Sequence, residues 1–329
     1  MCLTDSFGRR HTYLRVSLTD RCNLRCRYCM PAEGISWRSR ADILTLEEIL
    51  HVARVLVSQG VTKVRLTGGE PLVRQNIEWL IRRLAATPDL ETVAMTTNGM
   101  LLKNKVRSLR EAGLTALNVS LDTLRPERFR QIAGRDRFAD VITGIEEALA
   151  AGFRPLKVNT VIMAGVNDDE LLDFVALAKN RPINVRFIEY MPSRGTSWDR
   201  SAVFSCHEMM RRIETLHRLT PAENTYARMS SVARDFVIAA HAGKVSFISP
   251  LSADFCDRCS RIRLTADGFI KPCLFQSGTI NLRDALRRGA TDDQLGALIR
   301  AALDVKHDRH QPVTTLAADR ERTMCEIGG

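Results

Sequence analysis

The chain has 329 residues, of which 45% are hydrophobic and 26% charged, as in an ordinary globular protein with two domains or one barrel and an appendage. It contains neither a signal-peptide pattern nor an apolar run long enough to span a membrane, so we expect a cytoplasmic protein without membrane association. Its nine cysteines therefore indicate metal binding rather than disulfides. The net charge of +10 favours an anionic partner. Because the basic clusters are only doublets, such as Arg9-Arg10, a polyphosphate explains that charge better than nucleic acid.

The first part of the chain alternates short β-branched segments with amphipathic ones. We expect strands at Tyr13–Leu18, Lys63–Thr67, Thr92–Thr97, Ala116–Leu121, Leu156–Ile162 and Asn184–Tyr190. We expect helices at Leu46–Gln59, Ile77–Ala86, Asn104–Ala112, Phe138–Ala151 and Asp168–Asn180. Repeated βα units predict a parallel sheet with right-handed crossovers, either doubly wound or closed toward a TIM-like barrel.

Polar and apolar residues alternate within these strands, which decides between the two architectures. In the first strand, Leu14 and Val16 alternate with Arg15 and Ser17. Strands covered by helices on both faces would instead be continuously apolar. A face of hydroxyls, amides and cations is too costly for a dry core but suits the lumen of a barrel. We therefore expect an α/β fold, a partial (β/α)6 TIM-like barrel whose lumen holds a large, polar, anionic ligand.

The loop after the first strand contains Cys22, Cys26 and Cys29 in a C-x3-C-x2-C pattern. Closely spaced thiolates suit soft metals and iron–sulfur clusters. A 4Fe–4S cluster usually has four protein thiolates, so three leave one iron open to a ligand. A zinc site or unrelated thiols are the alternatives. The spacing, with Tyr28 before the last cysteine, resembles the signature of the radical S-adenosylmethionine (SAM) superfamily, in which SAM chelates the open iron.

A glycine pair, Gly68-Gly69, ends the second strand and is followed by Glu70. Adjacent glycines allow the backbone to approach a ligand closely, and we expect the Glu70 carboxylate to receive a cation. The alternative is a common strand-to-helix turn. The resemblance to radical SAM proteins implies that this turn holds the amino group of SAM.

The pattern changes after about residue 200. We expect a helix at Cys206–Leu216, strands at Phe236–Ala240 and Lys244–Ile248, a hairpin of Arg261–Thr265 and Phe269–Cys273, and helices at Leu282–Leu286 and Asp292–Leu303. The segment Glu223–Asp235 has too weak a pattern to place. We expect two domains: a radical SAM partial barrel at 1–200, and a C-terminal α+β extension at 201–329 with a second iron–sulfur site.

That second site is predicted by Cys256-x2-Cys259 and by Cys273, which the hairpin could carry near the other two. Zinc is the usual alternative, but a structural zinc needs a fourth ligand. The nearest candidates are His241 and Cys206, and both could simply be packed residues. Two three-cysteine sites therefore suggest two clusters, each with an open iron.

At this point the sequence resembles the GTP 3′,8-cyclase family of molybdenum cofactor (molybdopterin) biosynthesis. The resemblance runs from about Gly8 to the C-terminus. It includes CNLRCRYCM at 22–30, RLTGGEPL at 65–72, TTNG at 96–99, LNVSLDTL at 117–124, KVNTV at 157–161, RFIEYM at 186–191, FCDRCSRIRLTADGFIKPCLF at 255–275 and the terminal Gly328-Gly329.

The resemblance implies a role for each matching residue. Cys22, Cys26 and Cys29 would hold the SAM-binding cluster, and Cys256, Cys259 and Cys273 a second 4Fe–4S cluster whose open iron binds guanine. The positions that contact SAM are Tyr28, Gly69, Ser120 and Met191. Those that hold GTP are Arg15, Arg65, Thr96, Lys157, Arg261, Ile262 and Arg263. Gly328 and Gly329 would reach into the active site. Cys2, Cys206 and Cys325 have no role that the family supplies.

The cations of this set agree with the strand pattern, because Arg15, Arg65 and Lys157 belong to the polar strand faces. With Arg261 and Arg263 they supply five positive charges for a triphosphate, and guanidinium groups suit phosphate oxygens. Arg186 is a further cation, but the alternation leaves the direction of its side chain ambiguous.

The implied activity is that of a radical SAM lyase. SAM is cleaved to methionine and a 5′-deoxyadenosyl radical, which removes hydrogen from C3′ of GTP. The carbon radical then attacks C8, and one electron and one proton complete (8S)-3′,8-cyclo-7,8-dihydroguanosine 5′-triphosphate. An electron donor such as a flavodoxin or ferredoxin would serve it, and cyclic pyranopterin monophosphate synthase would take the product; either a monomer or a homodimer is possible. The alternatives are a peptide-modifying radical SAM enzyme and a non-catalytic iron–sulfur or zinc module that binds RNA.

Overall fold

The computed structural model describes residues 2–31, 33–222, 232–253, 255–312, 315–316 and 322–328. Six parallel strands run through the first part of the chain in sequence order. They are β1 (Tyr13–Ser17), β2 (Lys63–Thr67), β3 (Thr92–Thr97), β4 (Ala116–Ser120), β5 (Leu156–Ile162) and β6 (Ile183–Glu189). All six expected strands are confirmed, each to within one residue at either end.

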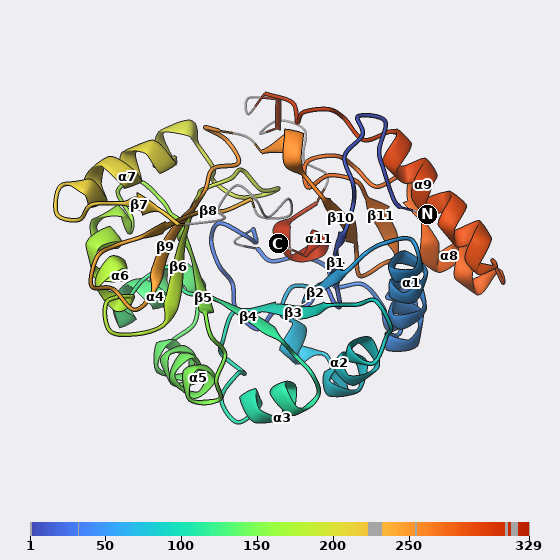
Figure 1. Cartoon of the computed structure of the whole chain (residues 1–329), viewed down its shortest axis with the longest axis horizontal. Coiled ribbons are helices and arrows are strands. Elements are labelled where there is room, and N and C mark those ends of the chain that lie inside the picture. The colour runs from blue at the N-terminus through green and yellow to red at the C-terminus, as the bar shows by residue number, and fades with distance from the viewer. Residues whose placement is uncertain are drawn as a thin grey trace.

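Helices follow the strands and cover the outer side of the sheet (Figure 1). They are α1 (Leu46–Ser58), α2 (Ile77–Ala85), α3 (Val106–Glu111), α4 (Pro126–Ala133), α5 (Phe138–Ala150) and α6 (Leu171–Leu177), the last preceded by a 3-10 turn at Asp168–Glu170. Sequence reasoning missed α4. The first helix begins at a capping box, in which the Thr45 hydroxyl accepts from the Glu48 amide and Glu48 in turn accepts from the Thr45 amide.

The later strands extend this sheet on both edges. β9 (Lys244–Ile248) lies parallel to β6, and β10 (Arg261–Leu264) lies parallel to β1. Antiparallel strands continue outward, with β8 (Arg234–Val237) and β7 (Thr220–Pro221) beyond β9, and β11 (Phe269–Lys271) and β12 (Ile280–Asn281) beyond β10. The sheet therefore has twelve strands in the order β12-β11-β10-β1-β2-β3-β4-β5-β6-β9-β8-β7, and it is continuous across residue 200.

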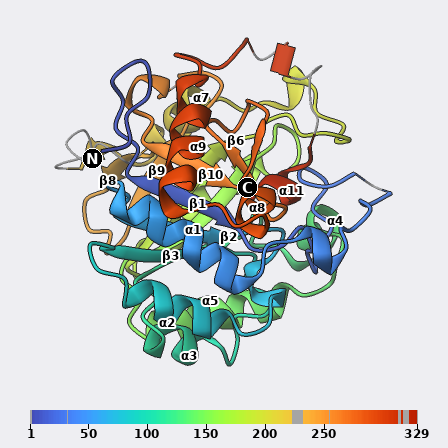
Figure 2. The ribbon, with the colours of Figure 1, turned by 90° about the vertical axis from the view of Figure 1, so that its right-hand side faces the viewer.

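The C-terminal helices lie on different sides of this sheet. α8 (Leu282–Arg287) and α9 (Asp292–Asp304) pack outside near α1, as Figure 2 shows. α7 (Cys206–Glu214) packs beside α6. In contrast, the short α11 (Met324–Ile327) lies in the middle of the ring of strands (Figure 1). Among the described residues, none of the helices combines the length and apolar character that a membrane span requires.

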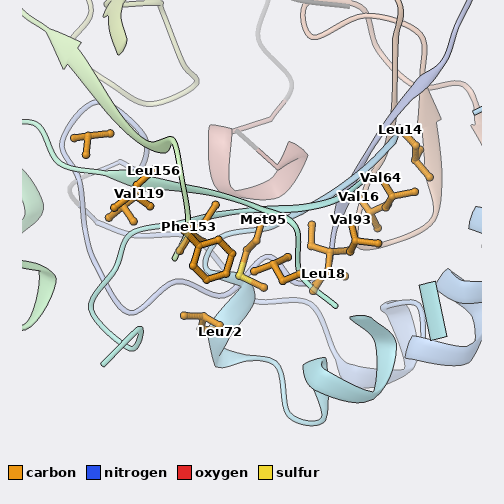
Figure 3. Close-up of a cluster of buried hydrophobic side chains, with 14 of the residues drawn as sticks. Leu14, Val16, Leu18, Val64, Leu72, Val93, Met95, Val119, Phe153 and Leu156 are labelled. Atoms are coloured by element: carbon orange, nitrogen blue, oxygen red, sulfur yellow. The ribbon is translucent and has the colours of Figure 1, made fainter. Parts of the chain in front are cut away.

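The alternation within the strands separates the core from the lumen. Leu14, Val16, Val64, Met95 and Val119 are fully buried on the helix-facing side (Figure 3). The residues between them face the lumen. The prediction of one apolar and one polar face is confirmed, and with it the partial barrel.

Candidate active site

The lumen contains a cavity of about 650 Å³ that all six barrel strands help to line. Its wall includes the first cysteine loop at one end and a group of arginines and lysines elsewhere. The cavity thus brings together two features that are separated in the sequence, and a small metal centre and a larger polar ligand could occupy it together.

The first cysteine loop is fixed against α4, the helix that sequence reasoning missed. The amides of Arg25 and Arg27 donate to the carbonyls of Ala133 and Ile132 at the end of that helix, at 2.8 and 3.0 Å. Gly134 caps α4 in the left-handed region (φ 67°), where an added Cβ would lie 2.9 Å from the Cβ of Arg25. Glycine therefore lets the loop lie close against the helix end.

Cys22, Cys26 and Cys29 all line the cavity. Cys22 Sγ accepts hydrogen bonds from the Leu24 amide (3.5 Å) and the Asn98 side chain (3.7 Å), contacts that stabilise a thiolate. Without a metal, burial raises the pKa of Cys22 to about 11 and raises that of Cys26 as well. Iron would offset this cost, because a bound cation favours the deprotonated thiol.

The donor set of this loop fits an iron–sulfur cluster. Three thiols line one cavity, and thiolates are the usual protein ligands of such clusters.

The Gly68-Gly69 turn packs directly on the segment that leads into the cysteine loop. The amide of Gly69 donates to Thr19 O at 2.7 Å, and a Cβ on Gly69 would lie 2.3 Å from Arg21 O. Both glycines line the cavity. Only a residue without a side chain allows this approach, so the turn exposes backbone to the ligand space.

The Glu70 carboxylate lines the cavity and also connects two strands, and its role in receiving a cation stays a prediction. It is fully buried and accepts from the Leu72 amide (3.0 Å), the Thr97 hydroxyl (2.6 Å) and the Asn98 amide (2.7 Å). Burial raises its pKa to about 7. Glu70 therefore ties the end of β2 to the end of β3.

The residues expected to contact SAM all line the cavity: Tyr28, Gly69, Ser120 and Met191. Asp122 also lines the cavity, and its carboxylate accepts from the Val161 amide at 2.8 Å. Burial raises the pKa of Asp122 to about 6. Sequence reasoning did not single out Asp122, although it lies one residue beyond the expected fourth strand.

The residues expected to hold GTP also line the cavity, with one exception: Arg15, Arg65, Thr96, Lys157, Arg261 and Arg263 do so, and Ile262 does not. Ile262 is fully buried in the hydrophobic core, because the alternation along β10 turns its side chain away from those of Arg261 and Arg263. Any contact of Ile262 with a ligand would have to come from its backbone.

Strand register gathers the cations into two rows. Arg15 is paired with Arg65 on one side and with Arg263 on the other. Two residues earlier in β1, on the same face of the strand, Tyr13 is paired with Lys63 and Arg261. Residues in register on the same face of a sheet are neighbours, so these side chains form one positively charged wall.

Burial and repulsion between neighbouring cations lower the pKa values of these lysines and arginines. Burial, together with Arg186 and the other nearby cations, lowers the pKa of Lys157 to about 7. Burial and its neighbours lower the pKa of Lys63 to about 8, and those of Arg186 and Arg263 to about 10. A polyphosphate would remove this repulsion.

The cavity contains functional groups that sequence reasoning left out. Tyr13 accepts from Arg65 Nε at 2.5 Å, and the surrounding cations outweigh burial and lower its pKa to about 6. Lys63 lies two residues before Arg65 in β2 and therefore on the same face of the strand. The alternation along this strand could have identified Lys63 as a cavity residue. Arg186 lines the cavity as well, which resolves its ambiguous direction. The Nε atoms of Arg186 and Arg261 are buried without a hydrogen-bond partner among the described residues.

The second cysteine site adjoins this wall. Cys256, Cys259 and Cys273 line a smaller cavity of about 60 Å³, and Arg261 and Arg263 line both cavities. The β10–β11 hairpin brings Cys273 beside the other two cysteines. Neither His241 nor Cys206 reaches this cavity; His310 does, but its ring nitrogens lie against the carbonyls of Gln311 and Pro250.

The second site is electropositive. Lys306 donates to Cys259 Sγ at 3.6 Å and to Arg261 O at 3.1 Å. Burial opposes ionisation of Cys259, but Lys306 and Arg261 outweigh it and lower the pKa of this thiol. These cations stabilise the thiolate form of Cys259, which suits ligation of a metal cluster.

The C-terminal tail enters the main cavity. Gly328 ends α11 with φ 75°, and its carbonyl accepts from Arg15 Nη2 (3.4 Å) and Arg263 Nη1 (3.3 Å). A Cβ on Gly328 would lie 2.5 Å from Thr67 Oγ1. Gly329 lies outside the described residues.

Comparison with known proteins agrees with this geometry. Residues 16–178 match the family described as Radical SAM superfamily, and residues 183–312 match Molybdenum Cofactor Synthesis C. GTP 3′,8-cyclase of Moorella thermoacetica is 45% identical over 99% of this chain and 100% of its own length. Molybdenum cofactor biosynthesis protein 1 of Mus musculus is 47% identical over 99% of this chain, which spans 51% of that relative.

A solved structure supports the fold. SuiB of Streptococcus suis bound to S-adenosylmethionine matches with a TM-score of 0.60 at 16% identity, covering 89% of this chain and 69% of that one. At such low identity the likeness concerns the fold alone. With nearly half of its residues shared with a full-length relative, the chain belongs to the GTP 3′,8-cyclase family of radical SAM enzymes.

Proposed function

We propose that this chain converts GTP to (8S)-3′,8-cyclo-7,8-dihydroguanosine 5′-triphosphate, the first step of molybdenum cofactor biosynthesis. The observation that carries the proposal is a single cavity whose wall contains three cysteines, a glycine-lined turn and a row of cations. A metal centre and a polyphosphate ligand could therefore lie close together in one cavity, where the reaction would take place. A second three-cysteine site borders the same cations.

Cys22, Cys26 and Cys29 would hold the first 4Fe–4S cluster, and Tyr28, Gly69, Ser120 and Met191 would contact SAM. When bound, the cluster and SAM together supply reductive cleavage of SAM to methionine and a 5′-deoxyadenosyl radical. The protein contributes orientation and the exclusion of water, because the strands and loops around the cavity enclose the reacting groups.

The positively charged wall would hold GTP. Arg15, Arg65 and Arg263 lie in register across three neighbouring strands, and their guanidinium groups suit the oxygens of a triphosphate. Thr96, Lys157, Arg261 and the backbone of Ile262 complete the set. Cys256, Cys259 and Cys273 would hold a second 4Fe–4S cluster, placed to contact the guanine end of GTP.

Gly328 and Gly329 would shape the site from the tail. The Gly328 carbonyl already contacts two of the arginines assigned to GTP. The tail thus connects the arginines that would bind GTP to the α11 helix. In this role the glycines determine how GTP is oriented for reaction more than how tightly it binds.

The proposal includes partners and context. A flavodoxin or ferredoxin would supply electrons, and cyclic pyranopterin monophosphate synthase would take the product. We place the reaction in the cytoplasm, since two clusters of free thiols require reducing conditions. We keep the division into a barrel at 1–200 and an extension at 201–329, and either a monomer or a homodimer.

Anaerobic reconstitution tests this function. The reconstituted chain should contain about eight irons if both sites hold 4Fe–4S clusters. With SAM, a reductant and GTP it should form the cyclised triphosphate and 5′-deoxyadenosine. A sample with both clusters that cleaves SAM but leaves GTP unchanged would contradict the proposal.

A further inference from the structure

Tyr13 is the aromatic member of the positively charged wall and lies between two of its cations. β1 runs between β2 and β10 (Figure 1), so that Tyr13 is in register with Lys63 on one side and with Arg261 on the other. Lys63 Nζ lies 4.8 Å and Arg261 Cζ 5.7 Å from the centroid of the Tyr13 ring. The ring is therefore within cation–π distance of both cations.

The hydroxyl of Tyr13 holds a third cation, Arg65. The Arg65 side chain donates from Nε to the Tyr13 oxygen at 2.5 Å, and from Nη1 to the Met95 carbonyl at 2.9 Å and the Thr96 hydroxyl at 3.2 Å. Because a guanidinium group carries its five N–H donors in one plane, these three hydrogen bonds fix its orientation. Its Nη2 donates to none of the described residues, which leaves two N–H groups for a ligand in the cavity that Arg65 lines.

The surroundings of the hydroxyl indicate a role in binding rather than in folding. β1 and β2 are already joined by their backbone ladder and by Leu14 and Val64, which are fully buried on the opposite face. On the cavity side, the three side chains that contact Tyr13 are all cations, and like charges at close range repel one another. Gathering them costs stability in the free protein and favours a polyanionic ligand.

From these contacts we propose that Tyr13 is a positioning residue for the polyphosphate of the substrate: its hydroxyl holds Arg65 so that the Nη2 side of the guanidinium group is presented to a phosphate. The inference rests on the proposed function, because it takes the triphosphate of GTP as the ligand of the wall. An arginine that is oriented before binding loses less side-chain entropy when the ligand arrives. Tyr13 thus adds to the affinity for GTP by acting through Arg65.

Tyr13→Phe tests the proposal, because it removes the hydroxyl and keeps the ring between Lys63 and Arg261. In the reconstituted enzyme, calorimetry should show that GTP and inorganic triphosphate both bind about tenfold more weakly. Iron content and SAM affinity should equal those of wild type, which also shows that the variant is folded. The KM for GTP should rise by the same factor with a much smaller change in kcat, as expected when ground-state binding is lost.

A double-mutant cycle assigns the effect to Arg65. Arg65→Met removes every donor and keeps a side chain of similar length, so adding Tyr13→Phe to it should weaken the binding of inorganic triphosphate no further. Arg263→Met is the matched control, because Arg263 lies on the same wall but donates to the Gly328 carbonyl at 3.3 Å. In that background the two losses should add to within about twofold.

The possible results separate this role from the proposed function. If Tyr13→Phe binds inorganic triphosphate as wild type does, or if its loss is as large in Arg65→Met as in Arg263→Met, the role of Tyr13 is overturned and the proposed function stands. The same holds if triphosphate and SAM affinity fall equally, since the hydroxyl would then support folding. A wild-type enzyme with both clusters that binds neither GTP nor inorganic triphosphate would overturn both.

Discussion

The two cysteine sites have the same number of thiols but opposite electrostatic surroundings. Carboxyl groups lie near the first site: burial raises the pKa values of Cys22 and Cys26, and Glu70 and Asp122, respectively, add to that effect. Cations surround the second, where Lys306 and Arg261 lower the pKa of Cys259. The difference follows from position, because Arg261 and Arg263 line the cavity of the second site as well as the main cavity.

This contrast matches the charges of the two proposed ligands. SAM carries a sulfonium and an ammonium group against one carboxylate, whereas GTP is a polyanion. The carboxyl groups at one end of the cavity would therefore favour SAM, and the positively charged wall would favour GTP. No separate pocket for each ligand is needed. If this account holds, changes at one end should leave binding at the other end intact.

Removing the thiols of either site should have the largest effect. Replacing Cys22, Cys26 and Cys29 by alanine should halve the iron, from about eight to about four per chain, and abolish SAM cleavage. GTP binding, measured by calorimetry, should persist. The matched variant without Cys256, Cys259 and Cys273 should also lose half of the iron but still bind SAM. Stoichiometric zinc in place of iron in anaerobically prepared wild type would contradict the cluster assignment.

Deleting Gly328 and Gly329 should have the next largest effect, because the tail touches the wall beside the first site. We expect cluster content and GTP affinity to change little and the yield of cyclised product to fall about 100-fold, as when a reacting group is misplaced by about 1 Å. SAM cleavage should continue, uncoupled from cyclisation. Normal product formation by the truncated chain would show that the tail has no part in the reaction.

Arg261→Ala and Arg263→Ala should weaken GTP binding selectively. Each removes a charge-assisted contact of about 1.5–3 kcal/mol, equivalent to a loss of affinity of roughly 10- to 150-fold. SAM affinity should be unchanged. Arg107→Ala, an exposed arginine on α3 that pairs with Glu111, is the control and should affect neither. Equal losses of both affinities would mean that the wall arginines support folding rather than GTP.

GTP affinity should fall as the pH rises above about 7. The pKa of Lys157 is about 7 and that of Lys63 about 8 in the free protein, and a bound polyanion raises both. Affinity is therefore highest where the lysines are already protonated and falls by up to tenfold per pH unit for each lysine above its free pKa. Calorimetry between pH 7 and 9 measures this. Lys157→Arg should flatten the profile, and a profile identical to wild type would exclude Lys157.

Local patterns were sufficient to predict most of the fold. The barrel strands and most helices follow from periodicity of two or 3.6 residues, which the sequence shows directly. The pairing of β9 with β6 and of β10 with β1 was not predictable, since it depends on distant segments meeting at the edges of a sheet. α4 was missed because it is short and largely polar, apart from the face that bears Phe129 and Ile132.

Residues of the candidate site were predictable where the spacing of cysteines, or the alternation of side chains along a strand, indicates their role. The cysteines and the wall residues Arg15 and Arg65 belong to that class. The structural role of Glu70 was not predictable, because its three hydrogen-bond donors come from two segments whose approach no local pattern reveals.

The most direct test of the account is transfer of hydrogen from GTP to the product of SAM cleavage. The anaerobically reconstituted chain is given SAM, a reductant and GTP with deuterium at C3′, and 5′-deoxyadenosine is analysed by mass spectrometry. Because both ligands would lie in one cavity, we predict one deuterium in each 5′-deoxyadenosine formed during cyclisation, together with the cyclised triphosphate. Cleavage of SAM in the presence of GTP without deuterium in 5′-deoxyadenosine would contradict the proposed reaction.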